Sequence, residues 1–277
     1  MADPQDSTEE IPSNSFHLQS PIFGRVSVDF LVNGDVHPCP YLPDRNAQEE
    51  IFFATRFPPE LYHDFMDQGF RRSGCLFYRP VCEECRECRA IRVSTTGFLP
   101  SKSQRRVLRK NQDLAITAQS PKFTMEKLRI FSDYTEFQHH RDPGDSQEEF
   151  LHSLYISPTM TLEFEYRLAG RLVAVSITDL CSRSLSSVYA YYDPDFCARS
   201  LGTLSALRET LFCQENNIPY YYIGFYIRDC PSMSYKARFR PYEILSPEYR
   251  WVRHELCGSQ ECAGRNSVGP DVPAGPN

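Results

Sequence analysis

The most specific chemical pattern in the sequence is three cysteines at two-residue intervals, Cys82, Cys85 and Cys88. Gaps of this length let one loop fold several thiolates around a single centre, and thiolates favour zinc or an iron–sulfur cluster. The candidates for a fourth ligand, with the histidine the weakest, are Cys39, Cys75 and His37. We expect Cys39 to complete the set. The alternatives are reduced thiols without a ligand or a redox-active pair.

A second pattern joins a predicted strand to a predicted helix through Arg199-Ser-Leu-Gly202. Acyltransferases of the acetyltransferase superfamily use an Arg-x-x-Gly entry to a helix to direct backbone N–H groups at a pyrophosphate. A single glycine near a helix start often serves only a turn. The three strands predicted before it and the strand predicted after it favour the acyltransferase interpretation.

Eight aromatic side chains lie on two strands that we expect to be neighbours: Tyr189, Tyr191, Tyr192, Tyr220, Tyr221, Tyr222, Phe225 and Tyr226. Alternation along a strand buries about half of them and leaves the others to line a cleft, where tyrosines can stack on a base or hydrogen-bond a ribose or an ester. Beyond them Lys236, Arg238 and Arg240 alternate, which predicts three cations on one face of an extended segment. The alternative is a solvated edge strand.

Positive charge is concentrated in one part of an otherwise acidic chain. Residues 71–110 contain nine Arg and two Lys against three Glu, a local net charge of +8, whereas the whole chain carries −6. Such a protein is a poor general DNA coater but can dock a polyanion at one place. The alternative is a solvated charged face.

The elements that position these residues can be predicted in outline. Helices are expected over 59–68, over 101–111 with a capping box of Ser101 and Gln104, over 200–216, and as two helices within 124–155 broken at 142–144. Three alternating segments, 161–168, 172–180 and 185–192, predict an antiparallel meander, and 219–227 predicts a further strand.

Composition places the chain among folded proteins. It has 277 residues, of which 41% are apolar and 24% charged, and no apolar run approaches the ~18 residues of a membrane span. The first ten residues carry four acids and no base, unlike a secretory leader, and eleven cysteines in such a chain are not expected to form a disulfide framework. We therefore expect a cytoplasmic protein with no membrane partner.

The chain resembles the aminoacyl-tRNA–protein transferases from about Val36 to Trp251. The similar segments are Cys39-Pro-Tyr-Leu-Pro43, Gly69-Phe-Arg-Arg-Ser-Gly74, Tyr78-Arg-Pro-Val-Cys82 with its two following cysteines, residues 101–111, Tyr192-Asp-Pro194, Ser200-Leu-Gly202 and Tyr235-Lys-Ala-Arg-Phe-Arg-Pro241. Within the family, the bacterial aspartate/glutamate leucyltransferases are the most similar branch. The family pattern Cys-Pro-Lys-Met appears here as Cys230-Pro-Ser-Met233, so a cation is missing at Ser232.

This resemblance implies an α+β fold with an acetyltransferase-like (GNAT-type) catalytic domain and a smaller cysteine-containing N-terminal region. The expected division is a disordered tail at 1–20, the cysteine-containing and basic region at 21–123, the catalytic domain at 124–257 and a disordered tail at 258–277. The implied activity is transfer of leucine from leucyl-tRNA to an N-terminal Asp or Glu of an acceptor protein, which marks that protein for degradation by the N-degron route.

Site residues follow from the chemistry of this reaction, in which an α-amine attacks an activated ester and only positioning and a modest base are needed. The candidates for moving the proton are Asp193, Tyr191, Tyr222 and Lys236. Arginine can pair bidentately with the acceptor carboxylate, and the candidates are Arg79, Arg92, Arg71 and Arg238. The candidates for binding tRNA are Lys102, Arg105, Arg106, Arg109, Lys110, Arg199 and Gly202. The chemistry itself requires no cofactor.

Three other functions remain open from the sequence. Arginyl transfer from arginyl-tRNA to the same acceptors uses the same machinery. A coenzyme A-dependent N-acetyltransferase shares the fold but gives the basic helix and the cysteine loop no role. A non-catalytic RNA-binding zinc module retains both of these and makes the tyrosine-rich cleft incidental.

Overall fold

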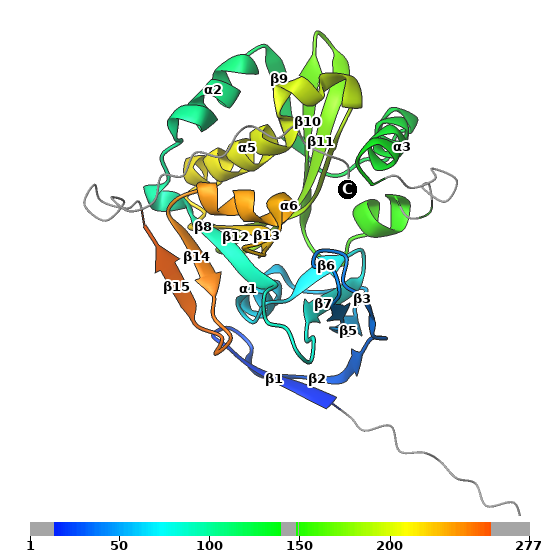
Figure 1. Cartoon of the computed structure of the whole chain (residues 1–277), viewed down its shortest axis with the longest axis vertical. Helices are drawn as coiled ribbons and strands as arrows, with labels where there is room; N and C mark the ends of the chain where they lie inside the picture. The colour runs from blue at the N-terminus through cyan, green and yellow to red at the C-terminus, as the bar shows by residue number, and fades with distance from the viewer. Residues whose placement is uncertain (1–13, 140–147, 149, 256–277) are drawn as a thin grey trace, which may run out of the picture.

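The computed structural model describes residues 14–139, 148 and 150–255, and over these residues the chain is a mixed α+β structure built on two main sheets (Figure 1). The smaller sheet has five strands in the order β1-β2-β5-β7-β6. Their bounds are β1 (Asn14–Ser20), β2 (Gly24–Asn33), β5 (Glu49–Phe53), β6 (Arg71–Ser73) and β7 (Leu76–Pro80). A separate ribbon pairs β3 (His37–Pro38) with β4 (Asn46–Ala47).

The larger sheet has eight strands in the order β15-β14-β8-β13-β12-β11-β10-β9. Their bounds are β8 (Arg89–Ser94), β9 (Leu114–Gln119), β10 (Thr161–Leu168), β11 (Arg171–Leu180), β12 (Ser184–Tyr192), β13 (Tyr220–Tyr226), β14 (Tyr242–Leu245) and β15 (Trp251–His254). The predicted meander is confirmed as β10, β11 and β12. Ala169 and Gly170 join its first two strands with φ of 47° and 89°, which fits the left-handed conformation of a two-residue hairpin turn.

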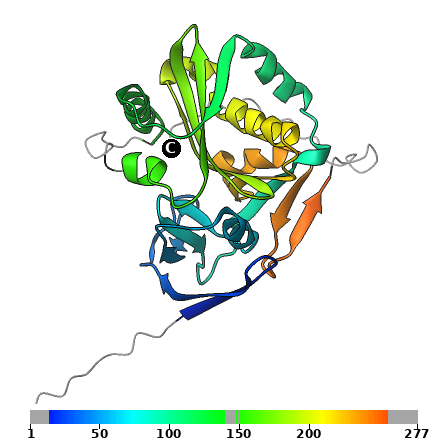
Figure 2. The ribbon, with the colours of Figure 1, turned by 180° about the vertical axis from the view of Figure 1, so that it is seen from behind.

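Helices cover both faces of the larger sheet (Figures 1 and 2). On one face lie α5 (Leu201–Glu215) and α2 (Lys102–Lys110), which pack against each other. The other face is covered by α3 (Met125–His139) and by the short π-helix η3 (Leu151–Tyr155). The capping box predicted for the basic helix is present, because the Ser101 hydroxyl accepts from the backbone N–H of Gln104 and the Gln104 side chain accepts from that of Ser101. Each face of the sheet therefore has its own apolar core.

A third core joins the two sheets around α1 (Pro59–Asp67), which begins at a proline and is followed by Gly69 at φ 87°. Its buried Tyr62 and Phe65 pack between the small sheet and Tyr222 of β13. A buried ion pair makes a second link, since Arg72 of β6 pairs with Asp179 of β11 and both side chains are fully buried. The small sheet is thus fixed directly against the strands that hold the site described below.

Three predictions about the fold need correction. Residues 14–20 form β1 rather than part of a tail, because Leu18 alternates inward and is buried. The strands of the smaller sheet end with β7 and those of the larger sheet begin with β8, so β8 and β9, which were assigned to the N-terminal region, pair within the larger sheet. The division into domains stays a prediction. Lys236 and Arg238 lie in the 3₁₀ helix η5 (Tyr235–Arg238), which follows α6 (Pro231–Ser234), so the predicted alternation is wrong.

Some predictions fall outside the described residues: the break at 142–144, most of the N-terminal tail, and the tail at 258–277. In the part of the chain that is described, no helix has the length and apolar character needed to span a membrane.

Candidate active site

The central feature of the larger sheet is the place where β12 and β13 separate. These parallel strands pair over three residues only, from Ser184↔Tyr220 to Ser186↔Tyr222. Directly afterwards both strands lose regular register with their other neighbours, β12 between Ser187 and Tyr189 and β13 between Tyr222 and Gly224. Irregularities of this kind bend a strand and turn its side chains. The sheet therefore opens between its two central strands.

A cavity of about 440 Å³ lies at this opening. Its wall includes residues 187–190 of β12, residues 223–225 of β13, and Gly202, Ser205 and Ala206 of α5. Aromatic side chains from several elements complete it: Tyr41, Tyr62, Tyr78, Tyr134, Tyr189, Tyr221, Tyr235 and Phe225. The predicted tyrosine-lined cleft is therefore present, although its tyrosines come from more elements than the two strands.

Three cations and no carboxylate line this cavity among the described residues: Arg71, Arg72 and Lys236. The two arginines differ in their partners. Arg72 makes two hydrogen bonds to the Asp179 carboxylate and others to Gly74 and Thr161. Arg71 is only 5% exposed, and its one hydrogen bond to oxygen is donated by Nη2 to the Ser187 carbonyl at 2.8 Å. Within the described chain it has no carboxylate partner, so its charge is directed at whatever enters the cavity.

Lys236 is the third cation and is 8% exposed. Its Nζ donates to the carbonyl of Phe225 at 2.7 Å and lies 3.1 Å from where a Cβ on Gly224 would stand. Burial, followed by the charge of Arg71, lowers the pKa of Lys236 to about 7. A lysine at this pKa can take up and release a proton near neutral pH.

Tyr221 lines the cavity and links it to a buried acidic residue of α5. Its hydroxyl donates to the carboxylate of Glu209 on α5, which is 1% exposed, and burial raises the pKa of Glu209 to about 7 although hydrogen bonding opposes the shift. The sequence interpretation did not single out Glu209. The available signal was an acidic residue four positions after Ser205 and eight after Leu201, on the inward face of a predicted helix.

Of the four residues predicted to move the proton, only Lys236 lines the cavity. Tyr191 lies deeper than Tyr189, in the core beneath α3, where its hydroxyl lies 3.3 Å from that of Tyr155. Tyr222 is fully buried against α1 and is hydrogen-bonded to Asp67 and Arg92. On β13 the alternation itself holds, because Tyr221, Ile223 and Phe225 line the cavity while Tyr222 packs against α1, so the sequence pattern did not indicate which set faces the opening.

Asp193 lies at the start of the 3₁₀ helix η4 (Pro194–Arg199) and not in the cavity. Its carboxylate accepts from the backbone N–H of Asp195 and from Arg171 Nη2 at 2.6 Å. These contacts hold the turn that leads into α5. The structure therefore favours a positioning role over direct proton transfer.

The predicted tRNA-binding residues form one continuous group at the entrance of α5. All five cations of α2 are exposed, and the Nζ of the last one, Lys110, donates to the Ala198 carbonyl at 2.5 Å. Arg199 is bidentately paired with Asp113. Gly202 lies in the first turn of α5 and lines the cavity. A basic surface thus leads to one end of the opening.

Three of the predicted acceptor-binding arginines lie elsewhere. Arg79 is paired with Glu50 at 2.6 Å, and Arg92 is paired with both Asp67 and Glu243. Arg238 is exposed on η5. None of the three lines the cavity, so Arg71 is the member of the predicted set that the structure brings to the opening.

The four predicted metal ligands lie near one another, because Cys39, Cys82 and Cys85 all contribute, after burial, to raising the pKa of Cys88 to about 12. Four thiols suit zinc or an iron–sulfur cluster. Over the described residues, however, no three Cys, His, Asp or Glu side chains converge as metal ligands, and Cys85 Sγ instead accepts from Arg45 at 3.2 Å. The described side chains thus form no converged ligand set, and a metal or cluster at these cysteines stays a prediction on which no step of the proposed reaction depends.

Comparison with known proteins addresses the family. The chain matches the family model described as arginine-tRNA-protein transferase, N terminus, over residues 37–106 and the one described as its C terminus over residues 126–246. It is 37% identical over 222 residues to an aspartate/glutamate leucyltransferase of Pseudomonas putida, spanning 78% of this chain and 93% of that protein. The chain belongs to the aminoacyl-tRNA–protein transferases.

A second member of the family, the aspartate/glutamate leucyltransferase of Pseudomonas fluorescens, is 38% identical over the same length and coverage. Among solved structures, the C-terminal domain of a putative lysylphosphatidylglycerol synthetase from Agrobacterium fabrum aligns with a TM-score of 0.44 at 14% identity, covering 70% of this chain and 65% of that one.

Proposed function

We propose that this transferase moves leucine from leucyl-tRNA to the α-amine of proteins that begin with Asp or Glu, and so marks them for the N-degron route. Membership of the family and the names of its relatives support an aminoacyl-tRNA donor and a protein acceptor. We further infer that the larger sheet is an acetyltransferase-like catalytic fold, because its parallel central strands separate beside the first turn of α5.

The observation that carries the proposal is the charge of the cavity. Arg71 and Lys236 face it, and no described acidic residue does. A carboxylate on the acceptor is attracted to such a site, whereas an arginyl side chain on the donor meets like charge, which costs several kcal/mol in a partly desolvated setting. A leucyl side chain instead finds apolar wall from Val188, Ile223 and Phe225. The cavity therefore favours an acidic acceptor and a neutral donor amino acid.

In this proposal Arg71 binds the carboxylate side chain of the first acceptor residue. Its guanidinium is held by Ser187, retains unpartnered N–H groups within the described chain and is almost wholly removed from water. A buried Arg that pairs with a carboxylate rejects neutral side chains, because it would then be left desolvated and unpaired.

In this proposal Lys236 is the general base that accepts the proton of the acceptor α-amine. The α-amine of a polypeptide has a pKa of about 7.7 to 8.0, so a neutral Lys236 can accept a proton from it as nitrogen attacks the ester carbonyl. The new C–N amide bond forms, the C–O bond to the terminal ribose breaks, and the proton passes from Lys236 to the departing ribose hydroxyl. No oxidant, reductant or nucleotide is consumed.

The basic surface of α2 holds the tRNA backbone and directs its 3′ end toward Gly202. Its cations, Lys102, Arg105, Arg106, Arg109 and Lys110, lie on the helix that packs against α5. Phosphate contacts of this kind position a nucleic acid without reading its sequence.

The acceptor assignment is tested with purified protein, leucyl-tRNA and three peptides identical except for a first residue of Asp, Asn or Lys. We expect an N-terminal leucyl amide on the Asp peptide, with kcat/KM at least about 100-fold above that of the Asn peptide. Equal modification of the Asp and Asn peptides would contradict the role of the cationic cavity, and the absence of product from all three would contradict transfer itself.

A further inference from the structure

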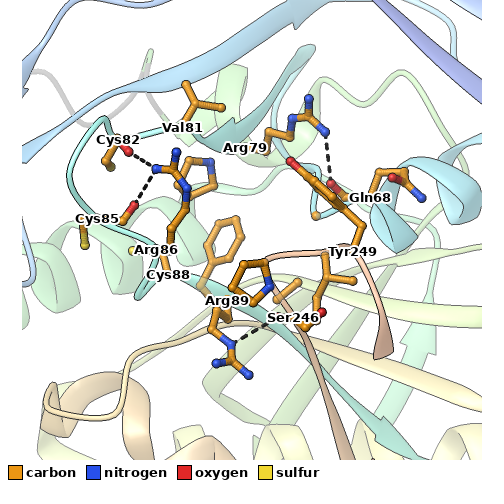
Figure 3. A pocket seen from close by; sticks show the side chains of 16 residues that line it. Gln68, Arg79, Val81, Cys82, Cys85, Arg86, Cys88, Arg89, Ser246 and Tyr249 are labelled. Carbon is orange, nitrogen blue, oxygen red and sulfur yellow. Dashed lines mark hydrogen bonds between the residues drawn. The ribbon is translucent and has the colours of Figure 1, made fainter. Parts of the chain in front are cut away.

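A second hollow, of about 140 Å³, lies beside the cysteine loop (Figure 3). It is bounded by the end of β7, the loop of residues 81–88, the start of β8 and the turn between β14 and β15. Arg79, Arg86 and Arg89 line it, and none of its described lining residues is Asp or Glu. This hollow, which we call the arginine cleft, therefore has the electrostatic character of an anion site.

Two of these guanidinium groups are available to a ligand. Arg86 Nη1 donates to the carbonyls of Cys82 and Cys85, and Arg89 Nε donates to the carbonyl of Leu245 at 3.2 Å (Figure 3). These bonds fix the side chains without neutralising them, and neither arginine forms an ion pair with any residue that the structure describes. Arg79 differs, because Glu50 neutralises it.

The arginine cleft adjoins the cavity between β12 and β13 that Arg71 and Lys236 line. Phe225 lines both, and its ring lies 6.2 Å from that of Tyr78 on the cavity side. The basic helix α2 approaches the cavity from the other end, at the start of α5, through the contact of Lys110 with Ala198. If the tRNA enters at the α5 end, the arginine cleft lies on the side left for the acceptor protein.

We propose that Arg86 and Arg89 form a subsite for acidic side chains at the second and third positions of the acceptor polypeptide. This inference rests on the proposed function, which places the first residue at Arg71. Two further extended residues add roughly 7 Å of reach, and the two hollows share Phe225 as a lining residue. Guanidinium groups bind carboxylates through charge-assisted hydrogen bonds, so the subsite selects among proteins that already begin with Asp or Glu.

The test uses the full chain as purified, with leucyl-tRNA and peptides that begin Asp-Glu-Glu, Asp-Gln-Gln or Asp-Lys-Lys and are otherwise identical. We expect an acceptor KM about tenfold lower for the Glu peptide than for the Gln peptide, and higher still for the Lys peptide. In the Arg86→Gln/Arg89→Gln variant this preference should fall to within about twofold, while KM for leucyl-tRNA stays unchanged. The Arg86→Lys/Arg89→Lys variant should retain part of it, and Arg25→Gln, a change on the exposed part of β2, should retain all of it.

Equal KM values for the three peptides in the unaltered protein would overturn the proposal, as would a preference that survives the double Gln variant. A rise in KM for leucyl-tRNA in that variant, with peptide preference intact, would assign the cleft to RNA and also overturn it. If no peptide is leucylated, the proposed function fails, and fluorescence anisotropy of the labelled peptides decides the subsite separately: the Glu peptide should bind the unaltered protein more tightly than the double variant, and equal binding would refute the subsite.

Discussion

Arg71 and Lys236 face the same cavity, and the charge of Arg71 adds to burial in lowering the pKa of Lys236 to about 7. Lys236 can therefore lose its proton near neutral pH. In the proposed function the pair divides the work of the reaction, because Arg71 would attract the acceptor carboxylate while Lys236 would accept the amine proton. This division explains how one small cavity can both select an acidic residue and activate its α-amine.

Replacement of Lys236 with Met should lower kcat by roughly 10²- to 10⁴-fold, the range for loss of a positioned general base. In the unaltered protein kcat should rise with pH through about 7 as Lys236 loses its proton. In the variant kcat should not show this rise with pH. Single-turnover rates between pH 6 and 9 measure it, and a variant with kcat within threefold of the unaltered protein would refute the role.

The same variant should be more stable than the unaltered protein. The pKa of Lys236 is lowered from 10.5 to about 7, so as pH falls through that window the unfolded chain takes up a proton that the native state does not. The native protein therefore loses stability between about pH 10.5 and 7, and Lys236→Met removes the loss. Urea unfolding at pH 9 and pH 7 should show the variant's advantage growing toward pH 7; an advantage that shrinks would contradict the burial of the amine.

The neighbouring arginines of β6 should respond oppositely to substitution. Arg71→Met should leave folding nearly intact but raise acceptor KM about 10- to 100-fold. Arg72→Met leaves Asp179 as an unpaired buried carboxylate and should lower the free energy of unfolding by about 3 to 5 kcal/mol. Denaturant titration and acceptor kinetics on both variants distinguish these effects. A strongly destabilised Arg71 variant with normal KM would reverse the two roles.

Substitution of Lys102, Arg105 and Arg106 with Gln should weaken binding of leucyl-tRNA and reduce its salt dependence. Three lost phosphate contacts should lower the slope of log Kd against log salt by about 2 to 3. Filter binding between 50 and 300 mM salt measures this. The matched control neutralises three exposed cations elsewhere, Lys122, Arg250 and Arg253, and a slope that changes equally in both variants would deny α2 a specific role.

Glu209→Gln should stabilise the protein increasingly as pH rises from about 4.5 to about 7. Burial raises the pKa of Glu209 over that interval, so the native state keeps a proton that the unfolded chain has released and loses stability as pH increases. Glutamine retains an acceptor for Tyr221 and has no charge to bury. The gain at neutral pH should be roughly 3 kcal/mol, measured by denaturant unfolding at pH 4.5 and 7.5; a variant destabilised at pH 7.5 would imply that the charged form is favoured there.

Local patterns in the sequence predicted much of the fold. Ser101 and Gln104 mark the start of α2, Gly69 marks the end of α1, and alternation identifies β10 to β12. These features depend on neighbours along the chain. The order of the eight strands depends instead on pairing between distant segments, and no local pattern indicates that β8 inserts between β14 and β13.

The site was predicted in part for the same reason. Arg71, Lys236 and Gly202 were identified from residue type and line the cavity. Tyr191 and Tyr222 were misplaced because alternation does not indicate which tyrosines are covered by distant elements, and these two are buried beneath α3 and against α1. The sequence did not indicate that Arg79 and Arg92 are neutralised, because their ion-pair partners Glu50 and Asp67 are distant from them along the chain.

The most direct test of the cationic cavity presents leucyl-tRNA and arginyl-tRNA separately to a peptide that begins with Asp, with product identified by mass spectrometry. The cavity predicts a leucyl amide formed with kcat/KM at least about 100-fold above that for arginyl transfer. Formation of the arginyl product at an equal or greater rate would contradict the account, because that side chain would then have to lie beside Arg71 and Lys236 in a cavity to which the described part of the protein contributes no carboxylate.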